Sequence, residues 1–173
     1  FGNIIFELGE DNEGQFIEIQ DNGIGMSPKV LTGPFLDFGE SFWGTSLMHE
    51  ELPGLESKGF SSTGQYGIGF FSVFMLGTKV CVTSKRFEDA RGNSLTLEFN
   101  HGITSRPILR PAIKDEIIKD GGTRIKVWVD SKTIRKLLEK RSKRYEHISL
   151  SELIESLCPA IDCNIDIREN GKI

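Results

Sequence analysis

Alternating apolar and polar positions at the start of the chain predict a β-hairpin. Residues 3–8 and 15–20 are two short runs rich in β-forming side chains, and a turn-forming stretch at 10–14 separates them. The dipeptide Ser27-Pro28 follows the second run. It predicts the start of a helix, because serine caps helix N-termini and proline suits the first helical position.

The middle of the chain changes from an irregular segment to an apolar one. Residues 33–63 hold many glycines and prolines but also several aromatic residues. This combination is typical of a mobile segment that still packs, as active-site lids do. Residues 64–69 are glycine-rich and lead into 70–76, which are apolar nearly all round. They predict a buried helix that begins at the glycines and stops at Gly77.

The second half of the chain predicts strands and then helices. Residues 123–129 alternate apolar and polar side chains, as a half-buried strand does. The expected strands are at 79–84, 94–99, 123–129 and 164–168, and the expected helices of the C-terminal part (131–158) are at 131–146 and 149–158, the last ended by Pro159. Together the elements predict an α+β two-layer sandwich, in which a mixed, mostly antiparallel sheet carries its helices on one face.

Composition fits one globular domain that spans residues 1–173. Hydrophobic residues make up 38% and charged residues 27%, an ordinary balance for a domain with its own core. The net charge of −4 argues against a nucleic-acid-binding surface that covers the whole protein. No apolar run approaches the ~20 residues of a membrane span and no signal peptide is visible, so we expect a cytoplasmic protein. The chain opens at Phe1 inside an expected strand, so we expect residues upstream to be missing.

The cysteines and histidines predict no metal or disulfide chemistry. The three cysteines form no C-x-x-C pair and the three histidines are scattered, which favours incidental thiols over a disulfide framework or a structural zinc site. These residues are Cys81, Cys158, Cys163, His49, His101 and His147.

The first candidate site is the hexapeptide Asp21-Asn22-Gly23-Ile24-Gly25-Met26. A carboxylate at the end of a strand accepts a hydrogen bond from an amino group in a pocket, and such a bond contributes roughly 1.5–3 kcal/mol when desolvated. The glycines allow the backbone to approach a flat ring closely. Taken alone, however, Asp-Asn-Gly is also a common turn, and a turn without binding is then the better interpretation.

The second candidate is the glycine loop Gly64-Gln65-Tyr66-Gly67-Ile68-Gly69. Glycines before a helix expose free N–H groups at the positive end of the helix dipole, where phosphate binds. A tight helix entry with close packing explains a lone glycine loop equally well. The spacing excludes a dinucleotide fingerprint, which needs G-x-G-x-x-G, and a P-loop, which needs a lysine after the glycines.

A third feature, Gly121-Gly122-Thr123, is in isolation an ordinary turn followed by a strand threonine. In their order and flanking residues, however, the three features resemble the GHKL ATPases, the superfamily of gyrase, heat-shock chaperone, histidine kinase and MutL. The resemblance is greatest to the ninety-kilodalton heat-shock chaperone (HtpG-like) family and runs over almost the whole chain. The stretches that carry it are 19–26, 64–72, 79–85 and 122–125.

The resemblance implies a Bergerat-type ATP-binding fold that takes ATP or ADP with Mg²⁺. It implies that Asp21 binds the adenine amino group, that Thr123 sits beside it and shares a water, and that residues 36–63 form the lid. The other implied site residues are Gly23, Gly25 and Met26 near the base, Gly64, Gln65, Tyr66, Gly67, Ile68 and Gly69 at the phosphates, and Phe70 flanking the nucleotide.

Two departures from the family pattern bear on turnover. The family's first motif is a helix with a glutamate that activates water and an asparagine that binds magnesium, and no Glu-x-x-x-Asn sequence precedes Asp21. We therefore expect the general base upstream of Phe1, assign no metal ligand in this chain, and expect no hydrolysis by these residues alone. Pro34 replaces an asparagine expected near the sugar and phosphates, and in the lid Glu40 stands where a triphosphate would meet positive charge.

The resemblance implies a chaperone-like ATPase in which nucleotide binding moves the lid and switches contacts in a homodimer that acts on protein clients. Two alternatives stay open: a nucleotide sensor or scaffold without turnover, and a defence or chromatin-type GHKL ATPase. The basic run at 135–144 is typical of a solvated helix face rather than a nucleic-acid patch. The aromatic residues of the lid are alternatively a partner interface.

Overall fold

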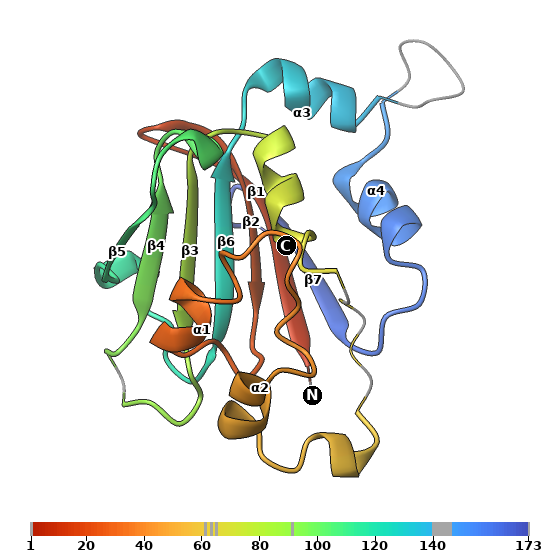
Figure 1. Cartoon of the computed structure of the whole chain (residues 1–173). Coiled ribbons are helices and arrows are strands. Elements are labelled where there is room, and N and C mark those ends of the chain that lie inside the picture. Colours follow the sequence, from red (N-terminus) through yellow and green to blue (C-terminus); the bar gives the residue numbers. More distant parts are fainter. Residues whose placement is uncertain are drawn as a thin grey trace.

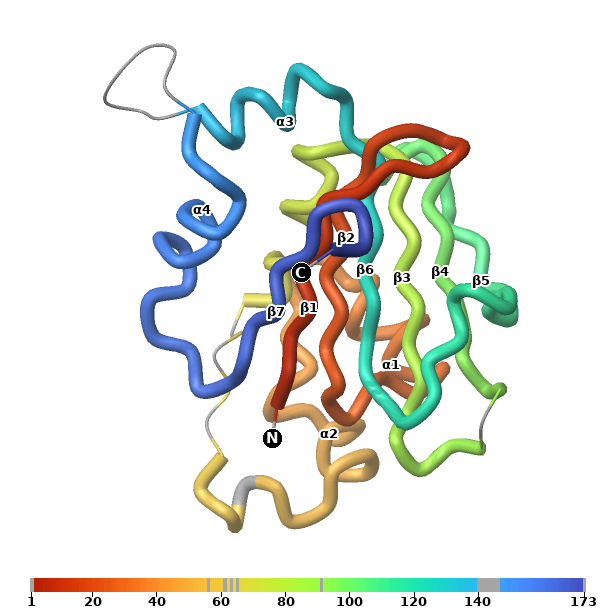
Figure 2. Tube along the Cα trace, turned by 180° about the vertical axis from the view of Figure 1, so that it is seen from behind, coloured from red at the N-terminus to blue at the C-terminus, as the bar shows by residue number. Residues whose placement is uncertain are grey.

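The computed structural model has the two-layer α+β architecture that the sequence predicts. It describes residues 2–60, 62, 64, 66–90, 92–139 and 147–172. One layer is a seven-stranded sheet in the order β5-β4-β3-β6-β2-β1-β7. The α-helices form the second layer on one face of this sheet (Figure 1), and the strands stand in front when the molecule is seen from behind (Figure 2). The predicted fold class is therefore confirmed.

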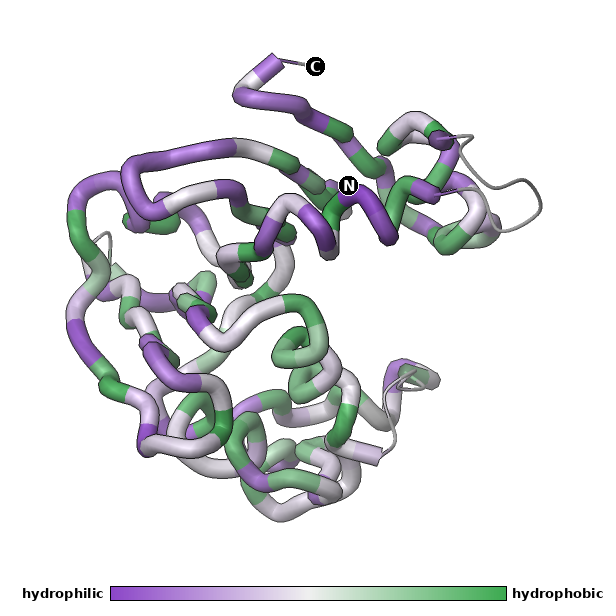
Figure 3. The backbone as a smooth tube through the Cα atoms, turned by 90° about the horizontal axis from the view of Figure 1, so that it is seen from above, coloured by the Kyte–Doolittle hydropathy of each residue, from purple (hydrophilic) through white to green (hydrophobic). Residues whose placement is uncertain are grey.

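The sheet is mixed because a single neighbouring pair of its strands, β1 and β7, runs parallel. The strands are β1 (Asn3–Asp11), β2 (Gly14–Asp21), β3 (Val80–Lys85), β4 (Leu95–Phe99), β5 (Ile108–Pro111), β6 (Gly122–Trp128) and β7 (Asn164–Glu169). The predicted hairpin is present, and its register pairs Asp11 with Gly14 across a two-residue turn. Along β7, hydrophilic and hydrophobic positions alternate as far as Arg168, and hydrophilic residues then lead toward the C-terminus, as Figure 3 shows from above.

The helices are short. They are α1 (Pro28–Thr32), α2 (Ser46–Glu51), α3 (Ser131–Leu137) and α4 (Leu150–Leu157), with 3₁₀ turns η1 (Glu56–Lys58), η2 (Phe70–Met75), η3 (Gly102–Thr104) and η4 (Lys114–Glu116). The predicted cap is confirmed, since the Val30 N–H donates to Ser27 Oγ at 3.3 Å and Pro28 opens α1. No helix in the described part of the chain is long and apolar enough to cross a membrane.

The hydrophobic core lies between the sheet and the helices. Alternate residues of a strand face the same side, and this periodicity puts the large aliphatic side chains of the central strands toward the helices. The buried members are Ile17, Leu31, Val80, Val82, Leu97, Phe99, Val127, Val129 and Ile134. Two residues that line the cavity described below, Asp21 of β2 and Thr123 of β6, belong to strands of this sheet.

The helix predicted at 70–76 differs from the observed one. It is the six-residue 3₁₀ turn η2, none of its residues is fully buried, and Met75 is 85% exposed. The cause is one-sided packing: Phe70 and Phe74 stack on Phe99 of β4 at ring-centroid distances of 5.7 and 5.1 Å, while Met75 turns away. The prediction of a helix that is buried on all sides was therefore wrong.

Two further predictions need correction. Helix α3 ends at Leu137 rather than 146, because Glu139 already pairs with His147 in an isolated bridge. Residues 140–146, with four members of the basic run, lie outside the described residues. Strand β5 was not predicted, because it has four residues, ends in Pro111 and pairs only with β4.

The face of the sheet opposite the helices is built from paired charges. Lys126 Nζ lies 2.7 Å from Asp11 Oδ2, and Arg110 Nε lies 2.7 Å from Glu98 Oε2. Arg110 also donates hydrogen bonds to both carboxylate oxygens of Glu116, from Nη1 to Oε2 at 2.7 Å and from Nη2 to Oε1 at 2.8 Å. Burial on this face raises the pKa of the Cys81 thiol to about 11, so the thiol stays protonated and inert at neutral pH.

The Arg110 cluster predicts an acid-dependent contribution to stability. Hydrogen bonds from Arg110 lower the pKa of Glu98; burial raises that of Glu116, but the same arginine outweighs it and the net pKa is lowered. A carboxyl group whose pKa is lowered in the folded state stabilises the fold at pH values above its ordinary pKa of 4.5. This contribution is lost as the pH falls through the lowered pKa. Arg110→Gln is therefore expected to cost about 1 kcal/mol at pH 7.

Urea unfolding of wild type and Arg110→Gln at several pH values measures this difference. The difference is expected to shrink as the pH falls through the lowered pKa values of the two carboxyls, because protonation removes their charge pairing with Arg110. An equal difference at pH 7 and pH 3 would mean that lost packing, rather than charge pairing, explains the effect.

Candidate functional site

A cavity of about 450 Å³ lies between the 21–26 turn, the lid segment and the glycine loop. It brings together motifs that are far apart in the sequence. Of the twelve residues predicted to bind nucleotide, nine line this cavity: Asp21, Gly23, Gly25, Met26, Gly64, Gly67, Gly69, Phe70 and Thr123. Tyr66 and Ile68 are 73% and 49% exposed and are not among its lining residues, and Gln65 lies outside the described residues.

Asp21 is held in a fixed orientation at the end of β2. Its Oδ1 accepts hydrogen bonds from the backbone N–H groups of Gly23 at 2.8 Å and Thr123 at 3.3 Å. Within the described part of the chain, Oδ2 has no hydrogen-bond partner, and Asp21 lines the cavity. One oxygen thus fixes the turn while the other is available to a donor on a ligand.

A chain of hydroxyl groups supports the turn from behind. Ser84 Oγ lies 2.9 Å from Thr123 Oγ1, donates to the Gly122 carbonyl at 3.0 Å, and accepts from the Met26 N–H at 2.8 Å. Strand β3 therefore ties β6 to the 21–26 turn through one serine. Ser84 lies in one of the stretches that carry the family resemblance, but no role for it followed from the sequence.

Gly25 is required by the packing of the chain against itself. Its φ is +67°, and a Cβ there would overlap the backbone carbonyl of Lys85. The observed close approach of this glycine is to the backbone of β3, and its predicted approach to a flat ring stays a prediction. The Phe87 N–H donates to the Ile24 carbonyl at 3.0 Å and fixes the same contact.

Part of the lid segment lies along the glycine loop. We call residues 38–41 the strap. The Gly39 N–H donates to the Gly67 carbonyl at 3.4 Å, and Ser41 Oγ lies 3.5 Å from the Gly64 carbonyl. Gly67 has φ +61°, and a Cβ on it would overlap the backbone of Glu40. The strap and the glycine loop therefore touch backbone to backbone.

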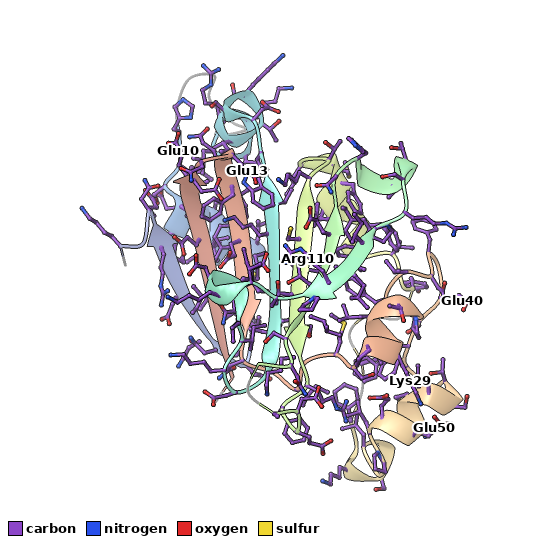
Figure 4. All side chains as sticks on the ribbon, turned by 90° about the vertical axis from the view of Figure 1, so that its left-hand side faces the viewer. Glu10, Glu13, Lys29, Glu40, Glu50 and Arg110 are labelled. Carbon is purple, nitrogen blue, oxygen red and sulfur yellow. The ribbon has the colours of Figure 1, made fainter. Side chains whose placement is uncertain are left out.

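The charged groups of the cavity are few and mostly acidic. Asp21 and Glu40 line it, and Arg86 is the one cation among its described lining residues. Figure 4 shows Glu40 on the strap, beside the helices and away from Arg110 on the sheet. Val30, Phe35, Phe42, Trp43 and Leu52 supply apolar walls. Such a cavity suits a flat, largely apolar ring with one amino group.

Sequence reasoning missed Arg86, Leu52 and Val30 as parts of the cavity. Arg86 directly follows the recognised stretch 79–85, and its place after a buried strand was the available signal. Val30 lies in α1 and Leu52 follows the last residue of α2, and the sequence did not specify how these short helices pack. Within the described residues, no group of three or more His, Cys, Asp or Glu side chains is arranged to hold a metal ion.

Comparison with known proteins agrees with this geometry. A family model described as histidine kinase-, DNA gyrase B-, and HSP90-like ATPase matches residues 3–121. The chain is 35% identical over 115 residues to the chaperone protein HtpG of Sulfurovum sp., which covers 66% of the chain and 17% of that relative. With HtpG of Borrelia garinii subsp. bavariensis it is 34% identical over 138 residues, covering 77% and 21%.

A longer and weaker match is that to HtpG of Shewanella pealeana, 27% identical over 168 residues and covering 95% of the chain and 26% of the relative. The chain thus spans about a quarter or less of the length of these curated relatives.

Proposed function

The chain belongs to the family of histidine kinase-, DNA gyrase B- and HSP90-like ATPases, and we propose that it binds an adenine nucleotide in the cavity between the 21–26 turn and the glycine loop. The observation that carries this proposal is the Oδ2 of Asp21, which has no hydrogen-bond partner within the described residues and lies in a cavity with largely apolar walls. Adenine presents one exocyclic amino group on a flat ring, and an oriented carboxylate is its natural acceptor. Met26, with Gly25 beside it, borders the base, and Thr123 stands next to Asp21.

The phosphates would lie at the glycine loop. Gly64, Gly67 and Gly69 line that end of the cavity, and Phe70 flanks it. Tyr66, Ile68 and Gln65 complete the loop without being assigned contacts. Because the strap bonds to carbonyls of this loop, we expect nucleotide binding there to be coupled to movement of the strap. Mg²⁺ would be held mainly by the nucleotide's own phosphates, as is usual for this ion.

For the whole protein we propose a cytoplasmic, chaperone-like ATPase that works as a homodimer on protein clients. The relationship to HtpG chaperones supports this reading. A nucleotide sensor without turnover is the alternative. Phosphate release by the intact protein, compared with that of an Asp21→Asn variant, separates the two.

Calorimetric titration of the intact protein with ADP and Mg²⁺ tests nucleotide binding directly. Saturable binding of one ADP per chain, with adenosine competing and GDP not competing, is expected. Equal binding of ADP and GDP would contradict the role given to Asp21. Absence of saturable binding at millimolar ADP would overturn the proposal.

Glu40 is expected to weaken phosphate binding in wild type. It lines the cavity beside the glycine loop and its side chain is exposed. Glu40→Lys should tighten ATP binding about tenfold, since a charge reversal a few ångströms from a polyphosphate changes the binding energy by roughly 1–2 kcal/mol near a surface. Calorimetry at low and high salt measures it, because salt screens such an effect.

Glu50→Lys on α2 is the matched control, with the same change of net charge at an exposed position that does not line the cavity (Figure 4). It is expected to change affinity less than twofold. If both variants tighten binding equally, net charge rather than the position of Glu40 is responsible.

A further inference from the structure

Three side chains from separate segments meet beside the cavity, and one of them, Arg86, lines it. Arg86 follows β3, Glu51 is the last residue of α2, and Ser27 caps α1. Arg86 Nη2 donates to the backbone carbonyl of Glu51, and Nη1 lies 3.4 Å from Glu51 Oε2. Ser27 Oγ donates to Glu51 Oε1 at 2.9 Å. Glu51 therefore connects α2 with the cap of α1 and with the residue that follows β3.

The pair is shielded from water. The side chains of Arg86 and Glu51 are 10% and 14% exposed, whereas Glu88, whose Oε2 lies 3.8 Å from Arg86 Nη2, is 64% exposed. Shielded ion pairs are screened little by salt, and an arginine left without its partner is costly to bury. The guanidinium also sits at the C-terminal end of α2, where a cation is favourable.

The position of this group matters for the lid. The strap lies between α1 and α2 in the chain, and Glu51 ties the end of α2 to the cap of α1. The segment that touches the glycine loop is therefore anchored at both of its ends. Loss of the Glu51 contacts frees α2, and with it the strap, while the cap that Ser27 provides to α1 is kept.

We propose that Arg86 is a positioning residue: by pairing with Glu51 it holds α2 and the strap over the cavity and so limits how fast nucleotide enters and leaves. The part that concerns nucleotide rests on the proposed function. The part that concerns α2 does not, because it describes the protein without ligand.

Hydrogen exchange in the free protein tests the hold on α2. The amides of His49 and Leu52 donate to the carbonyls of Thr45 and Met48 at 3.3 and 2.8 Å and report on this helix. In Glu51→Gln they are expected to exchange at least tenfold faster, while the Cys158 amide of α4, bonded to Ile154 at 2.9 Å, changes less than twofold. Arg86→Lys keeps the charge and is expected to restore most of the protection that Arg86→Gln loses.

Two comparisons separate positioning from general stability. Arg110→Gln removes an ion-paired arginine on the opposite face of the sheet, 27% exposed against 10% for Arg86, and is expected to leave the α2 amides unchanged. The double variant Glu51→Gln/Arg86→Gln is expected to exchange no faster at α2 than the faster single variant. Unchanged α2 exchange in Glu51→Gln, or equal acceleration in α2 and α4, would overturn the proposal.

Stopped-flow release of a fluorescent ADP analogue tests the consequence for nucleotide. Glu51→Gln is expected to release it at least fivefold faster and to bind it faster as well, so that affinity changes less than either rate. Unchanged rates in a variant with freed α2 would overturn the gating role. If the intact protein binds no ADP, the proposed function fails, while the exchange experiment still decides whether Arg86 holds α2.

Discussion

Replacing Asp21 by asparagine is expected to weaken ADP binding about a hundredfold, which corresponds to loss of a desolvated, charge-assisted hydrogen bond and its replacement by two opposed donors. The amide oxygen can still accept from the Gly23 and Thr123 N–H groups that now bond to Oδ1. The amide NH₂ group then faces the cavity, where the adenine amino group is also a donor. The turn keeps its hydrogen bonds, so the unfolding temperature should change little.

Calorimetry with two nucleotides measures this prediction sharply. Inosine diphosphate carries a carbonyl where ADP carries the amino group, so the asparagine variant is expected to bind it better than wild type does. Asp162→Asn, at an exposed position in the loop before β7, controls for the loss of one negative charge. ADP affinity that is equal in wild type and Asp21→Asn would remove Asp21 from the site.

The largest loss of stability is expected from Gly25→Ala. Gly25 has φ +67°, and its added Cβ would overlap the backbone carbonyl of Lys85, which cannot rotate away as a side chain does. Left-handed backbone at a residue other than glycine costs about 1–3 kcal/mol, and the overlap adds to it. We expect a loss of about 3 kcal/mol or more, which lowers the unfolding temperature by roughly 10 °C in a domain of this size.

Gly171→Ala is the matched control, because Gly171 has φ +76° but open space around the position of a Cβ. It carries the conformational cost without the overlap and should lose about 1 kcal/mol. Thermal unfolding of the two variants gives the difference. If both variants lose the same stability, the backbone at the contact between the 21–26 turn and β3 can shift to accommodate a Cβ at little cost.

Much of the fold followed from local patterns in the sequence. The first hairpin, the Ser27 cap and the central strands each depend on side chains close together in the chain, where alternation and capping chemistry act directly. Strand β5 and the turn η2 did not follow, because their state depends on a single distant neighbour. For η2, Phe99 decides which side of an apolar run is covered.

The candidate site divides in the same way. Asp21, the glycine loop and Thr123 were predicted to share one pocket from their motifs, and the structure places them around one cavity. The pairing of Arg86 with Glu51 and the contact of Glu40 with Gly67 were not predicted. Each involves at least one residue from a segment without a motif of its own, and only the folded chain defines such a partner. The binding roles themselves stay predictions.

The prolines of strand β5 bear on how the domain behaves in a crowded solution. The Ala112 N–H donates to the Ser94 carbonyl at 2.9 Å. Because hydrogen-bonding positions alternate along an antiparallel pair, the backbone hydrogen-bonding groups of Ile108 and Arg110 point toward β4, and those of Leu109 and Pro111 point away from the sheet. Pro111 has no N–H to offer there, and Pro107 precedes the strand. This border of the sheet presents a poor template for a foreign strand, so fibril growth and edge-to-edge aggregation are disfavoured on that side.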